Sequence, residues 1–134
     1  MSDISNSIEA TFRISGSAID IVTLDKRLKL VEGEVIKRPA SVPVNAMSES
    51  WWAIDVKMIN QESTEDAIMK ILDMIEPIRD VITEIADDKR FKIELDCEII
   101  INDDRPMIEV SAQTLKRVAN INAELGFEIF DYRE

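Results

Sequence analysis

The chain has 134 residues, 46% of them hydrophobic, which is enough for one domain with a substantial core. Its 27 acidic and 16 basic residues give a formal net charge of -11, so nucleic acid and anionic membranes are disfavoured as direct partners. It contains no histidine, one cysteine and three glycines, which excludes Ser-His and Cys-His nucleophiles, an internal disulfide and glycine-rich phosphate loops.

Alternating apolar and polar residues predict a first strand from Ile8, which Gly16 and Ser17 end. Residues 19–30 are typical of a short helix, with an acidic residue near its start and basic residues toward its end. Residues 31–47 include two prolines and have no regular period, so we expect a long connection there. Such a connection is uncommon inside a small domain and is often functional.

A second strand contains two adjacent tryptophans, Trp51 and Trp52. Neighbouring side chains on a strand point to opposite faces, and Trp52 shares its row with Ile54 and Val56. We therefore assign Trp52 to the core and Trp51 to the other face. Trp51 either packs beneath a covering loop or a second chain, or stays partly exposed as a binding anchor.

Residues 63–87 have helical periodicity, with Ser63 or Thr64 as the N-cap and isoleucines on one face. Pro77 interrupts this pattern and predicts two helices or one kinked helix. Residues 91–99 form the clearest strand, which buries Cys97 as an unreactive thiol.

After a turn at residues 102–106, we expect residues 107–110 to start a partner strand. Ser111 is the expected N-cap of the last helix, and Gly126 its expected C′ residue. Phe127 and Ile129 indicate the last strand, and Tyr132 is a candidate for a further residue of it.

These elements predict a single α+β domain over residues 1–134, a two-layer sandwich with a mostly antiparallel sheet and helices on one face. From Trp51 onward the order is the ferredoxin-like β-α-β-β-α-β, preceded by a β-α unit. No apolar run approaches the roughly 20 residues of a membrane-spanning helix, and the first ten residues do not look like a signal peptide. We expect a cytoplasmic protein.

Several segments resemble the bacterial domain of unknown function 4279 family. They are "FRISG", "SWWAID", "ILDMIEPIRDVITEIA", "FKIELDCEI" and "IEVSAQTLKRVANINAELGFEIFDY". The resemblance extends from about Ile8 to Tyr132, and Trp52 matches the family tryptophan. It implies a small bacterial domain with no established activity and no catalytic residues to transfer.

Acidic residues supply the main candidates for a binding site. If the helix is continuous through Pro77, spacings of three and four place one set on a single face, which we call the acidic helix stripe: Asp73, Glu76, Asp80, Glu84 and Asp87. Glu94 and Asp96 extend the field along the exposed side of their strand, together with Glu98. The stripe is either a solvated face or a docking surface for a basic protein.

Catalysis and metal binding are weaker interpretations of the same carboxylates. Magnesium and calcium take oxygen ligands, but carboxylates on alternate strand positions diverge and the spacing of an EF-hand is absent. Paired carboxylates can hydrolyse glycosides, yet only 5% of the residues are aromatic, too few for a sugar-binding cleft. We predict no metal, no cofactor and no catalytic residue.

The leading hypothesis is a non-catalytic protein-interaction module that uses an acidic surface against a basic protein. An immunity or antitoxin protein that neutralises a basic nuclease is one concrete form. The alternative is a small-molecule-binding or enzymatic domain, with a pocket near residues 31–47 lined by Trp51, Trp52 and Lys37. A homodimer through the open sheet face is a third possibility.

Overall fold

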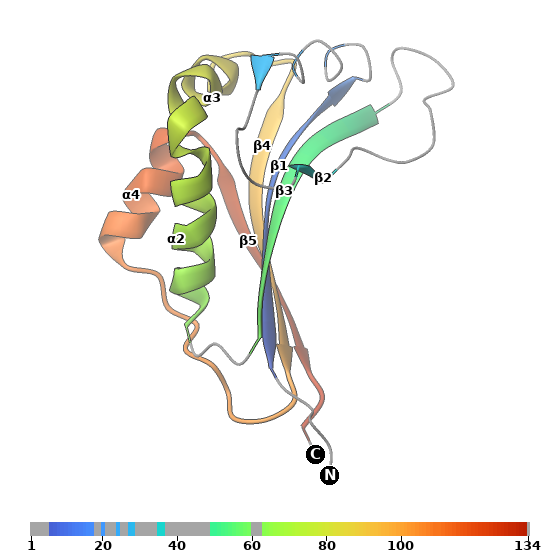
Figure 1. Ribbon diagram of the computed structural model, residues 1–134, viewed down its shortest axis with the longest axis vertical. Helices are drawn as coiled ribbons and strands as arrows, with labels where there is room; N and C mark the ends of the chain where they lie inside the picture. Colours follow the sequence, from blue (N-terminus) through green and yellow to red (C-terminus); the bar gives the residue numbers. More distant parts are fainter. Residues whose placement is uncertain are drawn as a thin grey trace.

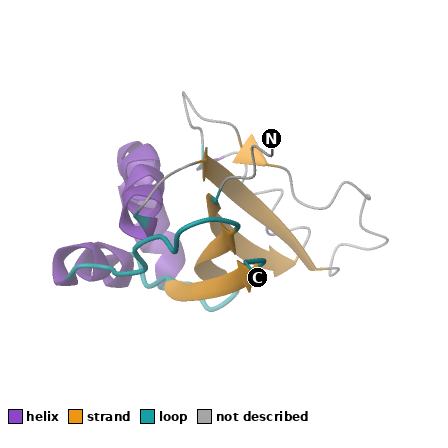
Figure 2. Ribbon diagram, turned by 90° about the horizontal axis from the view of Figure 1, so that it is seen from below, coloured by secondary structure: helices purple, strands orange, loops and turns teal. Residues whose placement is uncertain are grey.

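The computed structural model describes residues 6–17, 20, 24, 27, 28, 35, 36, 49–59 and 63–133. Over these residues the protein is an α+β structure, as predicted, with a sheet on one side and helices on the other (Figure 1). The view from below shows the same two layers (Figure 2). The strands are β1 (Ser7–Ser17), β2 (Val35–Ile36), β3 (Glu49–Ile59), β4 (Lys92–Ile101) and β5 (Glu124–Asp131). The helices are α2 (Thr64–Ile75), α3 (Arg79–Ala86) and α4 (Ala112–Asn120), with a single 3-10 turn, η1 (Glu76–Ile78), between α2 and α3.

The described strands form one mixed sheet in the order β2-β3-β1-β4-β5. The central strand β1 is antiparallel to both β3 and β4, and the short β2 is antiparallel to β3. In contrast, β5 is parallel to β4, because the chain leaves the end of β4 and returns through α4 before it enters β5. In the strand order, β5 is the last strand on this side of the sheet.

The core lies between the sheet and the helices. Every second residue of β1 and β4 is buried, from Ile8 to Ile14 and from Ile93 to Ile101. The isoleucines of α2 and α3 cover these rows from the helix side. Trp52 is 0% exposed and meets Phe12 edge to face, with ring centroids 6.3 Å apart, so its assignment to the core is confirmed.

Pro77 divides the long helical pattern in two. It lies in the 3-10 turn Glu76–Ile78, where its missing N–H costs no α-helical hydrogen bond. The two-helix alternative is the correct one. The Ser111 hydroxyl accepts a hydrogen bond from the Thr114 amide at 3.2 Å, so the predicted cap of α4 is also confirmed.

Two local predictions are wrong. Residues 107–110 are not a strand: Met107 forms only an isolated bridge with Ser63, and the segment belongs to the crossover from β4 to α4. The ferredoxin-like order, which needs that strand, is not confirmed. Gly126 is not the C′ residue of α4 but part of β5, and Asn122, with φ of 54°, takes the left-handed position after the helix.

The prediction for residues 19–30 falls mostly outside the described residues. Asp20, Leu24 and Arg27 are helical there, and Leu24 and Leu28 are buried in the core. Of residues 31–47, only Val35 and Ile36 are described, and they pair with Ile54 and Ala53 of β3.

Candidate functional site

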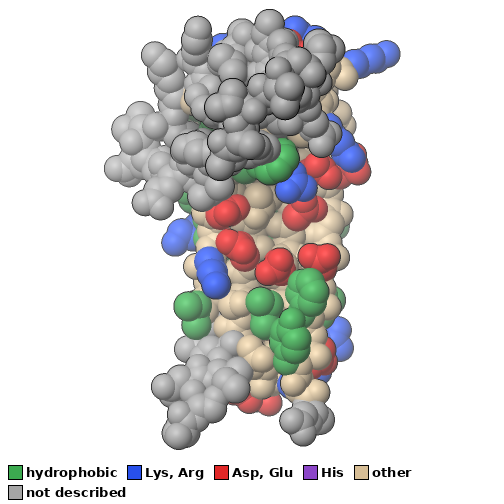
Figure 3. All heavy atoms as spheres, turned by 90° about the vertical axis from the view of Figure 1, so that its right-hand side faces the viewer, with side chains coloured by type: hydrophobic (Ala, Val, Ile, Leu, Met, Phe, Trp, Pro, Cys, Tyr) green, Lys and Arg blue, Asp and Glu red, His purple; other side chains and the backbone are tan. Residues whose placement is uncertain are grey.

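The polar side chains of the central strands share one face of the sheet, directed away from the helices. Strand registry arranges them in rows across β3, β1, β4 and β5. Figure 3 shows acidic side chains gathered across the middle of this face, above a hydrophobic group. We call this surface the acidic face; its carboxylates are Glu9, Asp55, Glu94, Asp96, Glu98, Glu124 and Glu128.

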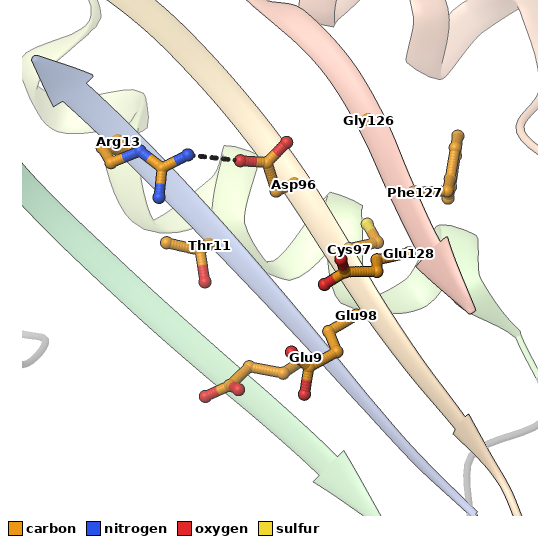
Figure 4. A pocket seen from close by; sticks show the side chains of 9 residues that line it. All are labelled: Glu9, Thr11, Arg13, Asp96, Cys97, Glu98, Gly126, Phe127 and Glu128. Carbon is orange, nitrogen blue, oxygen red and sulfur yellow. Dashed lines mark hydrogen bonds and ion pairs between the residues drawn. The ribbon is translucent and has the colours of Figure 1, made fainter. Parts of the chain in front are cut away.

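A concavity of about 420 Å³ lies within the acidic face, and we call it the trough. Figure 4 shows its lining from β1, β4 and β5, with the carboxylates of Glu9, Glu98 and Glu128 near one end. Gly126 lies opposite Asp96 in the β4–β5 register. A Cβ at Gly126 would stand 2.7 Å from Asp96 Oδ1, so the missing side chain leaves space for the Asp96 carboxylate and keeps the trough hollow.

Arg13 is the cation at the other end of the trough. Its Nη2 donates to Asp96 Oδ2 at 2.7 Å and lies 3.5 Å from Glu94 Oε1, so one guanidinium joins β1 to two carboxylates of β4. On the other side of β1, the Thr11 hydroxyl donates to Asp55 Oδ1 at 2.7 Å. These contacts fix the side chains that flank the trough.

Glu9 lies among several other charges of the acidic face. Partial burial raises its pKa above the ordinary value of 4.5, and the negative charges of Asp55 and Glu98 raise it further. Lys57, directly opposite on β3, acts in the other direction and only partly compensates. Negative charge is therefore in excess around Glu9.

Glu98 and Glu128 extend this excess across β4 and β5. They are register partners on neighbouring strands, and Glu98 is also the register partner of Glu9. Within the described part of the chain, neither Glu98 nor Glu128 has an ion pair or hydrogen bond. A cation entering the trough would meet the carboxylates of Glu9, Glu98 and Glu128, and Lys57 lies opposite Glu9 alone in the strand register.

The sequence profile of the domain of unknown function family DUF4279 matches residues 6–132. The chain belongs to this family. The match covers all five strands and every helix described above, and it assigns no activity. No curated protein and no solved structure matches the chain.

The acidic helix stripe lies on the helix layer of this DUF4279 chain, away from the acidic face. The 3-10 turn divides it between α2 and α3. Arg117 of α4 lies 3.0 Å from Asp73 and 3.7 Å from Glu76, and Arg27 lies 3.3 Å from Glu84. Asp80 and Asp87 are exposed. Much of the stripe's charge is thus matched by arginines of the same chain.

The other predicted site residues lie on the sheet. Glu94 and Asp96 belong to the acidic face, where Arg13 holds both. Trp51 is half-buried on the same face, opposite Ser15. Trp52 is fully buried on the helix side, so the two tryptophans do not line one pocket. Most of the predicted connection at residues 31–47, Lys37 included, lies outside the described residues.

Sequence reasoning missed several residues of the trough: Glu9, Thr11, Arg13, Gly126 and Glu128. The alternation of β1 and β4 did indicate that Glu9 and Glu98 point away from the core. It did not indicate that β1 lies between β3 and β4, which is what brings the charged rows together. Gly126 carried no signal, because a glycine after a helical pattern is a typical C′ residue.

Three further findings concern possible metal ligands, the Cys97 thiol and the lengths of the helices. Among the described residues, no three side chains of the types that bind metals are grouped to hold an ion. Burial raises the pKa of the Cys97 thiol to about 12, with Asp96 adding to the shift. No helix in the described ranges is long and apolar enough to cross a membrane.

Proposed function

We propose that this chain is a non-catalytic binding module that receives basic side chains of a protein partner in the trough of its acidic face. The observation that carries the proposal is the row Glu9, Glu98 and Glu128, in which Lys57 is the neighbouring cation. Partial burial is the main cause of the raised pKa of Glu9, and the negative charges of Asp55 and Glu98 add to it. A lysine or arginine from a partner would relieve this repulsion.

The helix layer supports the proposal less well. Arg117 and Arg27 already pair with three of the five stripe carboxylates, so a partner would have to displace contacts within the chain. We therefore move the predicted acidic docking surface from the helices to the sheet. An immunity or antitoxin role against a basic nuclease remains the concrete form that agrees with a net charge of -11.

A small polycation is a second candidate for the trough. Its volume of about 420 Å³ falls within the size range of small-molecule sites. However, charged residues line most of it, whereas drug-sized ligand sites are mostly apolar. This composition favours an amine over an apolar metabolite.

The test is titration of a fluorescein-labelled lysine-rich peptide, with binding followed by anisotropy at low salt. We expect Glu98→Gln and Glu128→Gln each to weaken binding by roughly threefold, because each removes one partly exposed charge pair. Asp80→Asn with Asp87→Asn is the matched control, since it removes the same charge from the helix layer. Equal loss in this control and in the variant that combines Glu98→Gln with Glu128→Gln would show that net charge alone attracts the peptide.

A second readout locates the bound cation. The pKa of Glu9, followed by carboxyl NMR, should fall toward 4.5 when the peptide binds, because a cation in the trough favours the ionised form. Binding that leaves the pKa of Glu9 unchanged would place the peptide elsewhere and contradict the proposal. A pKa shift with spermine but not with the peptide would favour the small-polycation candidate.

A further inference from the structure

The outer edge of β5 is the longest strand edge without a partner in the described part of the chain. β5 is the last strand of the sheet order and pairs with β4 alone. Its eight residues contain no proline, and the register with β4 continues without a break from Glu124 to Asp131. A regular edge of this length offers its backbone N–H and C=O groups to another extended chain.

The two faces of β5 differ in chemistry. On the helix side, Phe127 is 43% exposed and Ile129 is 48% exposed. Their register partners on β4, Cys97 and Ile99, are buried. The core therefore ends at β4, and Phe127 and Ile129 lie beyond it. On the acidic face, the same strand presents Glu124 and Glu128, followed by Phe130 near its end.

We propose that this edge binds an extended segment of the partner by strand addition, and that the segment alternates basic and apolar residues. Side chains of an added strand alternate between the two faces of the sheet. Those on one face would lie beside Glu124 and Glu128 and are favoured as lysine or arginine. Those on the other face would cover Phe127 and Ile129 and are favoured as apolar residues.

The alternation is required whether the segment runs parallel or antiparallel to β5, because both directions keep a period of two. The inference rests on the proposed function, since it specifies how a basic partner would reach the trough. Basic side chains on the added strand next to β5 would point over the acidic face, where Glu128 lines the trough.

The charge of the edge favours a basic partner over a second copy of the chain. Two copies would join surfaces of the same sign, each with a net charge of -11. Arg133 already pairs with Asp131 at 2.7 Å, and Lys92 lies 3.7 Å from Glu124, so neither cation is free to neutralise another copy. Glu128 has no cation among the described residues and would face the added strand unpaired.

The test compares three kinds of labelled peptide of equal length. The first alternates lysine and valine, the second is the same sequence with N-methyl groups on every second amide, and the third alternates glutamate and valine. We expect the first to bind and the second to lose at least about tenfold in affinity, because N-methylation removes the strand-to-strand hydrogen bonds. Two N-methylated peptides, one for each set of amides, cover both choices of edge.

Hydrogen exchange and variants of the full chain locate the bound peptide. Backbone amides of residues 124–131 should exchange more slowly in the complex, and Glu128→Lys should weaken binding by at least about fivefold at low salt. Asp80→Lys on α3 is the matched control, since it places the same new positive charge on the helix layer.

The outcomes separate the mode of binding from the proposed function. Equal binding of the methylated and unmethylated lysine peptides, without protection of β5, would overturn strand addition and leave the trough proposal standing. No binding of any lysine peptide would overturn both. A concentration-dependent dimer that protects β5 and excludes the peptide would assign the edge to a second copy and overturn the inference.

Discussion

Arg13→Gln should lower stability and raise the affinity of the acidic face for cations at the same time. The variant removes the guanidinium that lies 2.7 Å from Asp96 and 3.5 Å from Glu94. Exposed ion pairs contribute about 0.2–1 kcal/mol each, and Arg13 is 31% exposed, so solvent screens both pairs in part. We expect the free energy of unfolding to fall by about 1 kcal/mol.

Urea denaturation measures this loss. For an m-value of about 1.5 kcal/mol/M, a loss of about 1 kcal/mol moves the midpoint down by about 0.7 M. A double-mutant cycle with Asp96→Asn should recover at least about 0.5 kcal/mol of coupling at low salt. The coupling should shrink near 1 M salt, where the Debye length is only about 3 Å.

Peptide affinity should change in the opposite direction from stability. Without Arg13, Asp96 loses its cation and Glu94 keeps only Lys92, at 3.7 Å, so a lysine-rich peptide should bind roughly threefold more tightly. Arg79→Gln is the control, because Arg79 is more exposed and lies 3.7 Å from Glu76 on the helix layer. It should change neither quantity measurably.

Either of two results would refute this reasoning. Zero coupling between Arg13 and Asp96 would mean that the ion pair contributes nothing to the fold. A loss of stability without a gain in peptide affinity would mean that Arg13 does not compete with external cations, and the trough would then not be their binding site.

Three further predictions follow from single residues. Glu9→Gln should stabilise the protein by about 0.5 kcal/mol near neutral pH, because it removes a partly buried charge that also faces like charges across the strands. The folded state raises the pKa of Glu9, so its charge disfavours folding above that pKa, and the gain should disappear as the pH falls below 4.5; an unchanged gain in acid would contradict the electrostatic cause. Cys97 should resist thiol reagents until the protein is denatured, since its pKa is about 12, and fast labelling of the folded protein would refute its burial. Asn122→Ala should cost about 1 kcal/mol in thermal unfolding and Asn122→Gly less, because φ is 54° there; equal losses would assign the effect to the side-chain hydrogen bond to the Ala86 carbonyl.

Local patterns in the sequence predicted many of the elements correctly. Period-two alternation located β1 and β4 and assigned Trp52 to the core, because a half-buried strand must separate apolar from polar side chains. Pro77 indicated the break between α2 and α3, and Ser111 the start of α4, since both effects act within one turn of helix.

The two wrong predictions concern short segments whose sequence is compatible with more than one structure. Residues 107–110 combine apolar side chains with a preceding turn, which also suits a loop that packs Ile108 and Val110 against the core. Gly126 suits a helix end as well as a strand, and Asn122 supplied the left-handed residue instead.

By itself, the sequence determined the α+β class, the buried rows, the net charge and the absence of histidine chemistry, because these depend on composition and on local periodicity. Only the tertiary structure decided which charges meet. The strand order places β1 between β3 and β4, so that Glu9, Glu98 and Glu128, separated by many residues in the chain, form one row. It also set β5 parallel at the end of the sheet, which left its edge and the apolar side chains of Phe127, Ile129 and Phe130 exposed. Strand pairing depends on long-range packing, and local patterns therefore do not specify it.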